Sequence, residues 1–238
     1  MNFSTANEQT IISGILHAMS ITEKDLADDF REAISKTNRN GLPSAVWARR
    51  SDDLVDQFKQ FYNIEVFHIS RSRLWQIEPI FNRATGDLYL LFTDTNLARV
   101  KRKYLSKGFS THYLPSFLLK NSDLLPIEEN MELLPFDKEA VKKNDWKRQK
   151  DIEKMIGKDA ENVKKVITVS VSYHENEAIA ALLKEYTSDF ELSKETDVSY
   201  MLKTTYSGDN IMDDKDTPSY ESVQSLVTLK RSENISNK

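Results

Sequence analysis

The sequence predicts an α+β fold in which a helical N-terminal section packs on a mostly antiparallel sheet, followed by a flexible polar C-terminal tail. Helical periodicity dominates residues 5–61, and apolar residues alternate with polar ones in several segments of residues 64–202. After residue 206 the chain is rich in Asp, Ser, Asn and Lys. We therefore expect a single α+β domain over residues 1–206 and a largely disordered tail over residues 207–238.

Two amphipathic segments predict a helical hairpin at the N-terminus. Thr5 and Glu8 have the spacing of a capping box, and apolar residues on one face continue to Met19. Thr22 with Asp25 predicts the start of a second helix, which ends by residue 36. The short break between the two segments is typical of such a hairpin.

A basic loop and a third helix are expected next. Residues 38–50 contain the turn dipeptides Asn-Gly and Leu-Pro, which predict a loop with at most one short helical turn after Pro43. Ser51 is predicted to cap the third helix, because Asp52 and Asp53 then lie at its positive end.

Residues 64–92 predict a β-meander, because apolar side chains alternate there and turn residues divide the segment. Pro79 is expected at a sheet edge or a bulge, since proline has no N–H for the ladder. Gly86 can supply the positive φ of a hairpin loop. The predicted parts are a strand at 64–70, a turn at Arg71 and Ser72, a strand at 73–82, a hairpin loop at 83–87 and a strand at 87–92.

The rest of the chain is predicted to contain both helices and short strands. Residues 177–185 are ambiguous: their Ala, Leu, Glu and Lys content prefers a helix, whereas their position after a turn at 174–176 suits the return strand of a hairpin, which we favour. The other expected elements are a helix from Thr93 or Asp94 to Gly108, strands at 113–119 and 163–173, a connector at 124–135, a charged helix at 137–156, and short strands at 190–192 and 199–202.

The composition excludes several classes of site. The 238 residues include no cysteine, which excludes disulfides, thiolate-bound zinc and iron–sulfur clusters and suits a reducing cytosol. No Lys or Arg precedes the apolar run at residues 11–19, as a signal peptide would require, and no stretch has the length of a membrane span. We expect a cytoplasmic protein without a membrane partner.

Sequence motifs for cofactors, metals and catalysis are absent. All six glycines are isolated, so a Gly-rich phosphate cradle or dinucleotide fingerprint is not possible, and we expect no cofactor. The four histidines lack the spacing of a helical zinc pair, and we expect no metal. A metal-dependent nuclease needs converging carboxylates. The carboxylates of the predicted meander, for which we favour structural roles, are Glu65, Glu78, Asp87 and Asp94.

The strongest candidate site is a cluster of basic and aromatic side chains that would bind an anion or a nucleic acid. Arginine forks bind carboxylate or phosphate, and tryptophan offers a stacking face. Residues 36–107 carry 13 Lys and Arg against 7 Asp and Glu, a balance that could steer an anionic partner. The alternative is a mixed surface whose charged patches cancel in three dimensions. The candidates are Arg39, Trp47, Arg49, Arg50, Arg71, Arg73 and Trp75, with His112 and Tyr113 as further candidates.

The alternative interpretation of this cluster is structural. It places Trp47 and Trp75 in the core and pairs the arginines with nearby acids, which are Asp52, Asp53 and Asp56. The basic face of the fourth predicted helix is expected to be solvated, since lysines on an exposed helix need no ligand. This face comprises Arg99, Lys101, Arg102, Lys103 and Lys107.

Two motifs resemble a bacterial and prophage protein family of unknown function. The first is an Asn/Gly/Trp loop before a helix, and the second is an Arg/Trp hairpin that ends in a Leu-Tyr step. Their residues are Asn38-Arg39-Asn40-Gly41, Trp47, Asp53-Leu54 and Phe58, then Arg71, Leu74-Trp75 and Gly86-Asp87-Leu88-Tyr89-Leu90-Leu91. The resemblance implies a bacterial or mobile-element setting and no assigned activity, so it identifies no catalytic residue.

Two functions are consistent with these observations. We expect a non-enzymatic binding or regulatory module, of prophage or plasmid origin, that acts by contact with a protein partner. The alternative is a nucleic-acid-binding protein, a divergent nuclease or a nuclease inhibitor that uses the Arg/Trp cluster.

Overall fold

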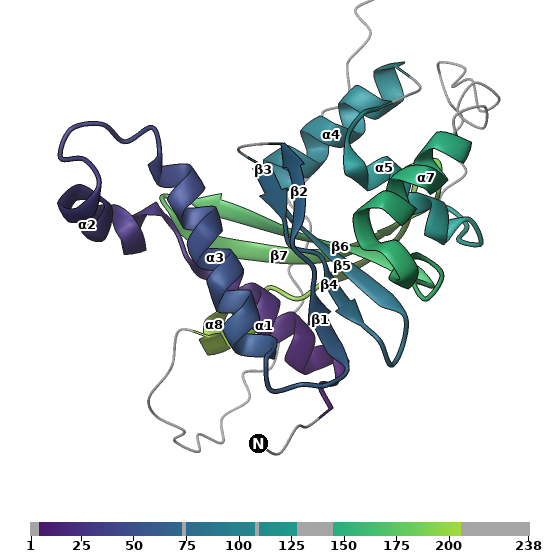
Figure 1. Ribbon diagram of the computed structural model, residues 1–238, viewed down its shortest axis with the longest axis horizontal. Coiled ribbons are helices and arrows are strands. Elements are labelled where there is room, and N and C mark those ends of the chain that lie inside the picture. Colours follow the sequence, from purple (N-terminus) through teal and green to yellow (C-terminus); the bar gives the residue numbers. More distant parts are fainter. Residues whose placement is uncertain (1–4, 73–74, 108–109, 128–144, 206–238) are drawn as a thin grey trace, which may run out of the picture. The chain divides into compact units, whose positions relative to one another are not determined.

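A six-stranded sheet forms the centre of the computed structural model, which describes residues 5–72, 75–107, 110–127 and 145–205 (Figure 1). These residues belong to one compact unit, Met1–Gly208, and the predicted tail lies outside them. Neighbouring strands are antiparallel except for β5 and β6, which confirms a mostly antiparallel sheet. In sheet order the strands are β1 (Ile64–Val66), β4 (Ile80–Asn82), β5 (Asp87–Thr93), β6 (Lys165–His174), β7 (Glu177–Tyr186) and β8 (Leu192–Asp197).

Three helices pack on one face of the sheet. Their apolar side chains form one buried cluster with Tyr89 of β5 and Val169 of β6. Gly14 permits close packing between two of the helices, because a Cβ at this position would lie 2.8 Å from Cζ of Phe58. The predicted packing of the N-terminal helical section on the sheet is therefore confirmed. The helices are α1 (Glu8–Ser20), α3 (Leu42–Phe58) and α8 (Tyr200–Thr205).

Three further helices, α4 (Asp94–Lys107), α5 (Tyr113–Leu118) and α7 (Asp145–Ile156), join a second buried cluster on the opposite face. The alternation in β5 separates the two clusters, since Leu88, Leu90 and Phe92 belong to the second and Tyr89 to the first. Two 3₁₀ turns, η1 (Leu119–Asn121) and η2 (Gly157–Ala160), follow α5 and α7. Among the helices of the described residues, none is long and apolar enough to cross a membrane.

The side chain of Asn121 completes the hydrogen bonding between β6 and β7. Its Nδ2 donates to the carbonyl oxygens of Val166 and Tyr186, both at 2.8 Å, and its Oδ1 accepts from the N–H of Val166 at 2.8 Å. The register pairs Thr168 with Lys184, so Val166 and Tyr186 lie just beyond the last pair of this ladder. The buried amide therefore replaces a strand pair and ties η1, and with it α5, to the sheet.

Helix α3 begins at Leu42 and not, as predicted, at Ser51. Pro43 lies in the first turn, where its missing N–H costs nothing. The Leu-Pro dipeptide predicts a turn, although the same dipeptide can also begin a helix. Buried residues at helical spacing confirm the longer helix, and they are Leu42, Val46, Arg50, Leu54 and Phe58.

Two segments predicted as strands are helical. Residues 113–119 form α5 and the first residue of η1, and residues 200–202 of the second segment belong to α8. All six residues of α5 are buried, so the segment has no exposed polar face and gives no helical period. Pro115 lies in its first turn, where an N–H would have no helical partner.

The predicted meander is interrupted by a separate hairpin. Residues 64–70 divide between β1 and β2 (Ile69–Ser72), and residues 73–82 divide between β3 (Trp75–Ile77) and β4. Strands β2 and β3 pair only with each other among the described strands, so Arg71 and Ser72 are strand residues and not a turn. The N–H of Phe67 donates to the carbonyl oxygen of Pro79 at 2.9 Å, which closes the base of the hairpin.

Other local predictions are confirmed. Residues 177–185 form a strand, and the turn before them contains Glu175 and Asn176 with φ of 49° and 63°, as a tight hairpin requires. Helix α2 (Glu23–Ala33) starts after Thr22 as predicted, and the Thr22 N–H donates to Oδ2 of Asp25 at 2.7 Å. The capping box predicted at Thr5 and Glu8 is wrong, because Asn7 caps α1. The hairpin loop between β4 and β5 has Gly86 at φ 83°.

Candidate anion-binding site

The β2–β3 hairpin carries the first residues of the candidate site. It stands beside α4 (Figure 1). Ile69 and Ile77 anchor it in the apolar cluster on the α4 side of the sheet. Trp75 is 48% exposed, which is unusual for so large an apolar side chain. The two isoleucines therefore fix the hairpin in the core, while the indole of Trp75 stays accessible.

A basic pocket lies between this hairpin, α4 and the residues just before α5. Its volume is about 320 Å³, and no carboxylate of the described residues lines it. The hairpin contributes Arg71 and Trp75, and α4 contributes Arg99 and Lys103. The remaining polar lining consists of Ser110, Thr111, His112 and Tyr113. The positive charges converge without a neutralising acid, which is the chemical requirement of an anion site.

His112 reports the electrostatics of the basic pocket. Its pKa is lowered to about 4, first by burial and then by the charges of Arg71, Arg99 and Lys103. The ring is therefore neutral at physiological pH. Its Nδ1 accepts from the N–H of Leu114 at 3.2 Å, so the ring proton lies on Nε2. His112 thus retains one N–H that can donate to a ligand.

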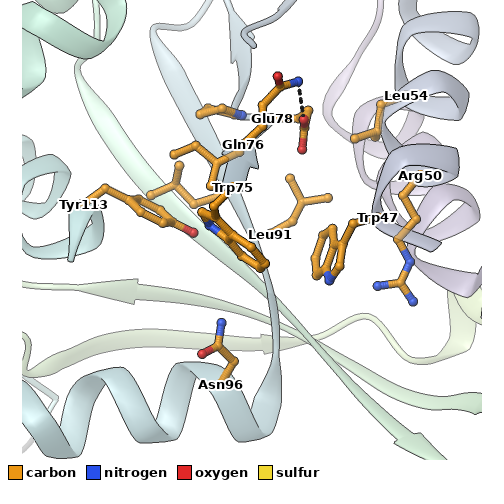
Figure 2. Close-up of a pocket in the computed structure, with 12 residues that line it drawn as sticks. Trp47, Arg50, Leu54, Trp75, Gln76, Glu78, Leu91, Asn96 and Tyr113 are labelled. Carbon is orange, nitrogen blue, oxygen red and sulfur yellow. Dashed lines mark hydrogen bonds between the residues drawn. The ribbon is translucent and has the colours of Figure 1, made fainter. Parts of the chain in front are cut away.

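A narrow crevice continues from the basic pocket towards α3 (Figure 2). Trp75 and Tyr113 line both cavities. Trp47 of α3 meets Trp75 edge to face, with ring centroids 6.5 Å apart and an interplanar angle of 62°. This contact restricts the rotation of Trp75, so its accessible indole surface is held in a defined orientation for stacking.

The helical form of α3 separates two arginines that were predicted to act together. Arg50 is 5% exposed and its guanidinium donates to the carbonyl oxygen of Ile21 at 2.9 and 2.6 Å. It also lies 4.8 Å from the ring centroid of Trp47 and 5.3 Å from that of Tyr173. Arg49, the next residue on the helix, is exposed. Arg50 is therefore held by a backbone carbonyl and two aromatic rings, and it lines the crevice but not the basic pocket.

Two further predicted members of the site are Arg39 and Arg73. Arg39 is exposed and lies 4.0 Å from Glu23, away from the residues that line the basic pocket. Arg73 lies outside the described residues. Of the acids predicted to pair with the arginines, Asp53 and Asp56 have other hydrogen-bond partners. Asp53 accepts from His17 at 2.9 Å, and Asp56 accepts from Lys59 at 2.8 Å. The hydrogen bond from Lys59 lowers the pKa of Asp56, and the charge of Arg49 also helps to lower it.

Arg99 and Lys103 were not among the predicted site residues, because both were expected on a solvated helix face. Their spacing of four residues places both on one side of α4, and this signal was present in the sequence. It does not reveal that the hairpin brings Arg71 to the same side. The charges of Arg71, Arg99 and Lys103 come together only in the tertiary structure.

The carboxylates considered for a nuclease have individual partners. Glu65 pairs with Arg83, and Glu78 accepts from Nε2 of Gln76 at 2.8 Å (Figure 2). Asp94 accepts from Ser170 at 3.1 Å and lies 3.4 Å from Lys184. Within the described ranges, no group of three or more His, Asp or Glu residues could hold a metal ion.

The fold and the pocket define an α+β protein with a basic, aromatic-edged cavity beside its central sheet. The chain belongs to the family of unknown function DUF5986, whose sequence model matches residues 4–238. The predicted resemblance to a family of unknown function is thus confirmed, and a bacterial or prophage origin stays a prediction. No curated protein and no solved structure matches the chain.

Proposed function

We propose that this protein is a non-enzymatic binding module that recognises single-stranded nucleic acid through the basic pocket. The observation that carries the proposal is the convergence of Arg71, Arg99 and Lys103 in a cavity lined by no described carboxylate. The accessible indole of Trp75 adds a surface for a base. Cationic grooves combined with aromatic stacking surfaces are the common arrangement of proteins that bind single strands.

The same features favour a single strand over a duplex. A base inside a duplex is stacked on both sides, so it cannot also stack on Trp75 without being unpaired. An unpaired base can leave its neighbours and contact the indole at little cost. The sugar–phosphate chain would then place a phosphate at the adjoining cations, since Trp75 lines both the crevice and the basic pocket.

The test is a binding titration with fluorescently labelled single- and double-stranded oligonucleotides across a salt series. We expect affinity for the single strand to fall as salt rises, with a slope of about −0.7 per phosphate contacted. Arg71→Ala should weaken binding about tenfold, because it removes a charge-assisted hydrogen bond. Trp75→Ala should weaken it by a similar factor, because stacking of one base contributes about 1–3 kcal/mol.

Two substitutions serve as matched controls. Arg102 is exposed on α4 but does not line the basic pocket, and Arg49 is exposed on α3. Arg102→Ala and Arg49→Ala remove the same charge as Arg71→Ala, and binding should change less than about twofold. Equal losses in all these variants, or no binding at low salt, would contradict the proposal. Cleavage of the oligonucleotide with Mg²⁺ or Mn²⁺ would show that the module is an enzyme.

A second candidate function, contact with a protein partner, is favoured by a groove between α2 and α3. The groove has a volume of about 590 Å³. Its apolar lining includes Leu26, Phe30 and Ile34, and Ile34 is 66% exposed. Acidic side chains border it, namely Asp25, Asp29 and Asp53, with Arg49 and His17 as the basic members. An apolar groove with an acidic border suits a basic amphipathic helix.

Substitution of the groove tests this second function. We expect Ile34→Glu and Asp29→Lys to abolish recovery of a protein partner in a pull-down from a cell lysate, since they remove an apolar contact and reverse a charge. Asp28→Lys is the matched control, because Asp28 pairs with Arg31 at 3.1 Å and does not line the groove. Failure of the unmodified protein to recover any partner would count against protein contact.

A further inference from the structure

We infer that the basic pocket prefers a terminal phosphate, the phosphomonoester at the end of a single-stranded nucleic acid, over a phosphodiester within the strand. This inference rests on the proposed function and names the chemical group that the pocket selects. Three observations carry it: the charge of the pocket, the number of its donors, and the position of Trp75 beside it.

The charge of the pocket exceeds what a phosphodiester can balance. Arg71, Arg99 and Lys103 supply three positive charges, and no carboxylate of the described residues lines the cavity. A phosphodiester carries one negative charge, whereas a phosphomonoester carries about −1.5 to −2 at neutral pH. The dianion leaves less positive charge unneutralised, so binding of a terminal phosphate removes more of the repulsion among the three cations.

The donors of the pocket also match a terminal phosphate. Arg99 uses one guanidinium nitrogen on Oδ1 of Asn96 at 2.8 Å and keeps its other N–H groups. Arg71, Lys103 and the hydroxyl of Thr111 add further donors in the lining of the same cavity. His112 contributes Nε2–H, because its Nδ1 is engaged by Leu114. A phosphomonoester offers three terminal oxygens to these donors, one more than a phosphodiester offers.

The neighbouring indole identifies the molecule to which the phosphate is attached. Trp75 lines the pocket, remains 48% exposed and is held by Trp47 at 6.5 Å. A nucleotide places an aromatic base next to its own phosphate, so both groups can be recognised together. A phosphopeptide would use the cations and has no general need for the indole. The arrangement therefore favours a terminal nucleotide over a phosphorylated side chain.

The test compares three labelled single-stranded oligonucleotides of one sequence, which carry a 5′-phosphate, a 3′-phosphate or no terminal phosphate. We expect one phosphorylated end to bind at least tenfold more tightly than the unphosphorylated strand at pH 7.5. Arg71→Ala and Lys103→Ala should abolish this preference, and Arg102→Ala should preserve it. Trp75→Ala should weaken all three strands. A phosphopeptide of similar length serves as the competing ligand.

The preference should also depend on pH in one direction. The charged groups nearest the phosphate are Arg71, Arg99 and Lys103, and the crevice adds Glu78 and Arg50 further away. Burial raises the pKa of Tyr113 above its ordinary value, and the pKa of His112 is about 4, so both remain neutral between pH 5 and 7.5. The second pKa of a phosphomonoester is about 6. Acidification to pH 5 should therefore reduce the preference for the phosphorylated strand.

The outcomes separate this inference from the function on which it rests. Equal binding of all three strands would overturn the preference for a terminal phosphate while leaving recognition of single strands intact. Absence of binding to any oligonucleotide would overturn both. Tighter binding of the phosphopeptide than of every strand, unaffected by Trp75→Ala, would overturn the assignment of the ligand as a nucleic acid.

Discussion

Replacement of Asn121 by alanine is expected to lower the free energy of unfolding by about 3–5 kcal/mol, because each buried backbone group left without a partner costs about 1–3 kcal/mol. The substitution removes three hydrogen bonds of 2.8 Å, and it leaves the N–H and C=O of Val166 and the C=O of Tyr186 without them. The site is completely buried, so water cannot easily replace the amide. Urea unfolding followed by circular dichroism measures the change.

Asn162→Ala provides the comparison for this substitution. Asn162 is exposed and donates to Asp159 at 3.4 Å, so its loss should change stability by less than about 0.5 kcal/mol. The expected difference in the melting temperature is several degrees, since 1 kcal/mol corresponds to about 2–4 °C in a domain of this size. A loss below about 1 kcal/mol for Asn121→Ala would mean that the strands re-pair directly when the amide is removed.

The sequence predicts the layers of this fold better than the boundaries of its elements. Alternation of Val or Ile with Thr or Ser in residues 163–173 identifies β6, and the short apolar run at 87–92 after a glycine turn identifies β5. Amphipathic periodicity identifies α1 and α2, because each presents an apolar and a polar face. A segment buried on every side gives no such contrast. Helix α5 is buried throughout, so its apolar residues look the same as those of a short buried strand.

Turn chemistry explains the other differences. Asn-Gly at residues 40–41 and Pro43 are compatible with a loop, but they stand at the start of α3. Pro79 is predicted at a sheet edge or a bulge, whereas it lies between β3 and β4, where the chain returns from the hairpin to the sheet. The direction of the β2–β3 hairpin is set by tertiary contacts, because Ile69 and Ile77 pack in the core.

The candidate site is predictable only in part for the same reason. Residue types identify Arg71, Trp75, His112 and Tyr113 as candidates, and these four residues line one pocket. Residues that are adjacent in the sequence need not line the same site, because successive side chains of a helix point in different directions. The position of Arg50 among Leu54 and other buried residues of α3, at helical spacing, is the signal that would have separated it from Arg49.

Replacement of Arg50 by alanine is expected to lower the free energy of unfolding by about 3 kcal/mol, since hydrogen bonds from charged groups contribute about 1.5–3 kcal/mol each. Its guanidinium joins α3 to the carbonyl oxygen of Ile21, between α1 and α2, through contacts of 2.9 and 2.6 Å. Burial lowers the pKa of Arg50, while Tyr173 and Asp25 act in the opposite direction. The substitution also removes packing against Trp47 and Tyr173.

Arg50→Lys and Arg49→Ala make the comparison specific to the buried guanidinium. Lysine retains the charge but cannot place two donors on one oxygen, so Arg50→Lys should lose about half as much stability as Arg50→Ala. Arg49 is exposed on the same helix, and its replacement should change stability by less than about 0.5 kcal/mol. Equal effects of Arg49→Ala and Arg50→Ala would contradict the separation of the two side chains. A selective loss at Arg50 would show that a residue predicted to bind an anion instead fixes the helices behind the pocket.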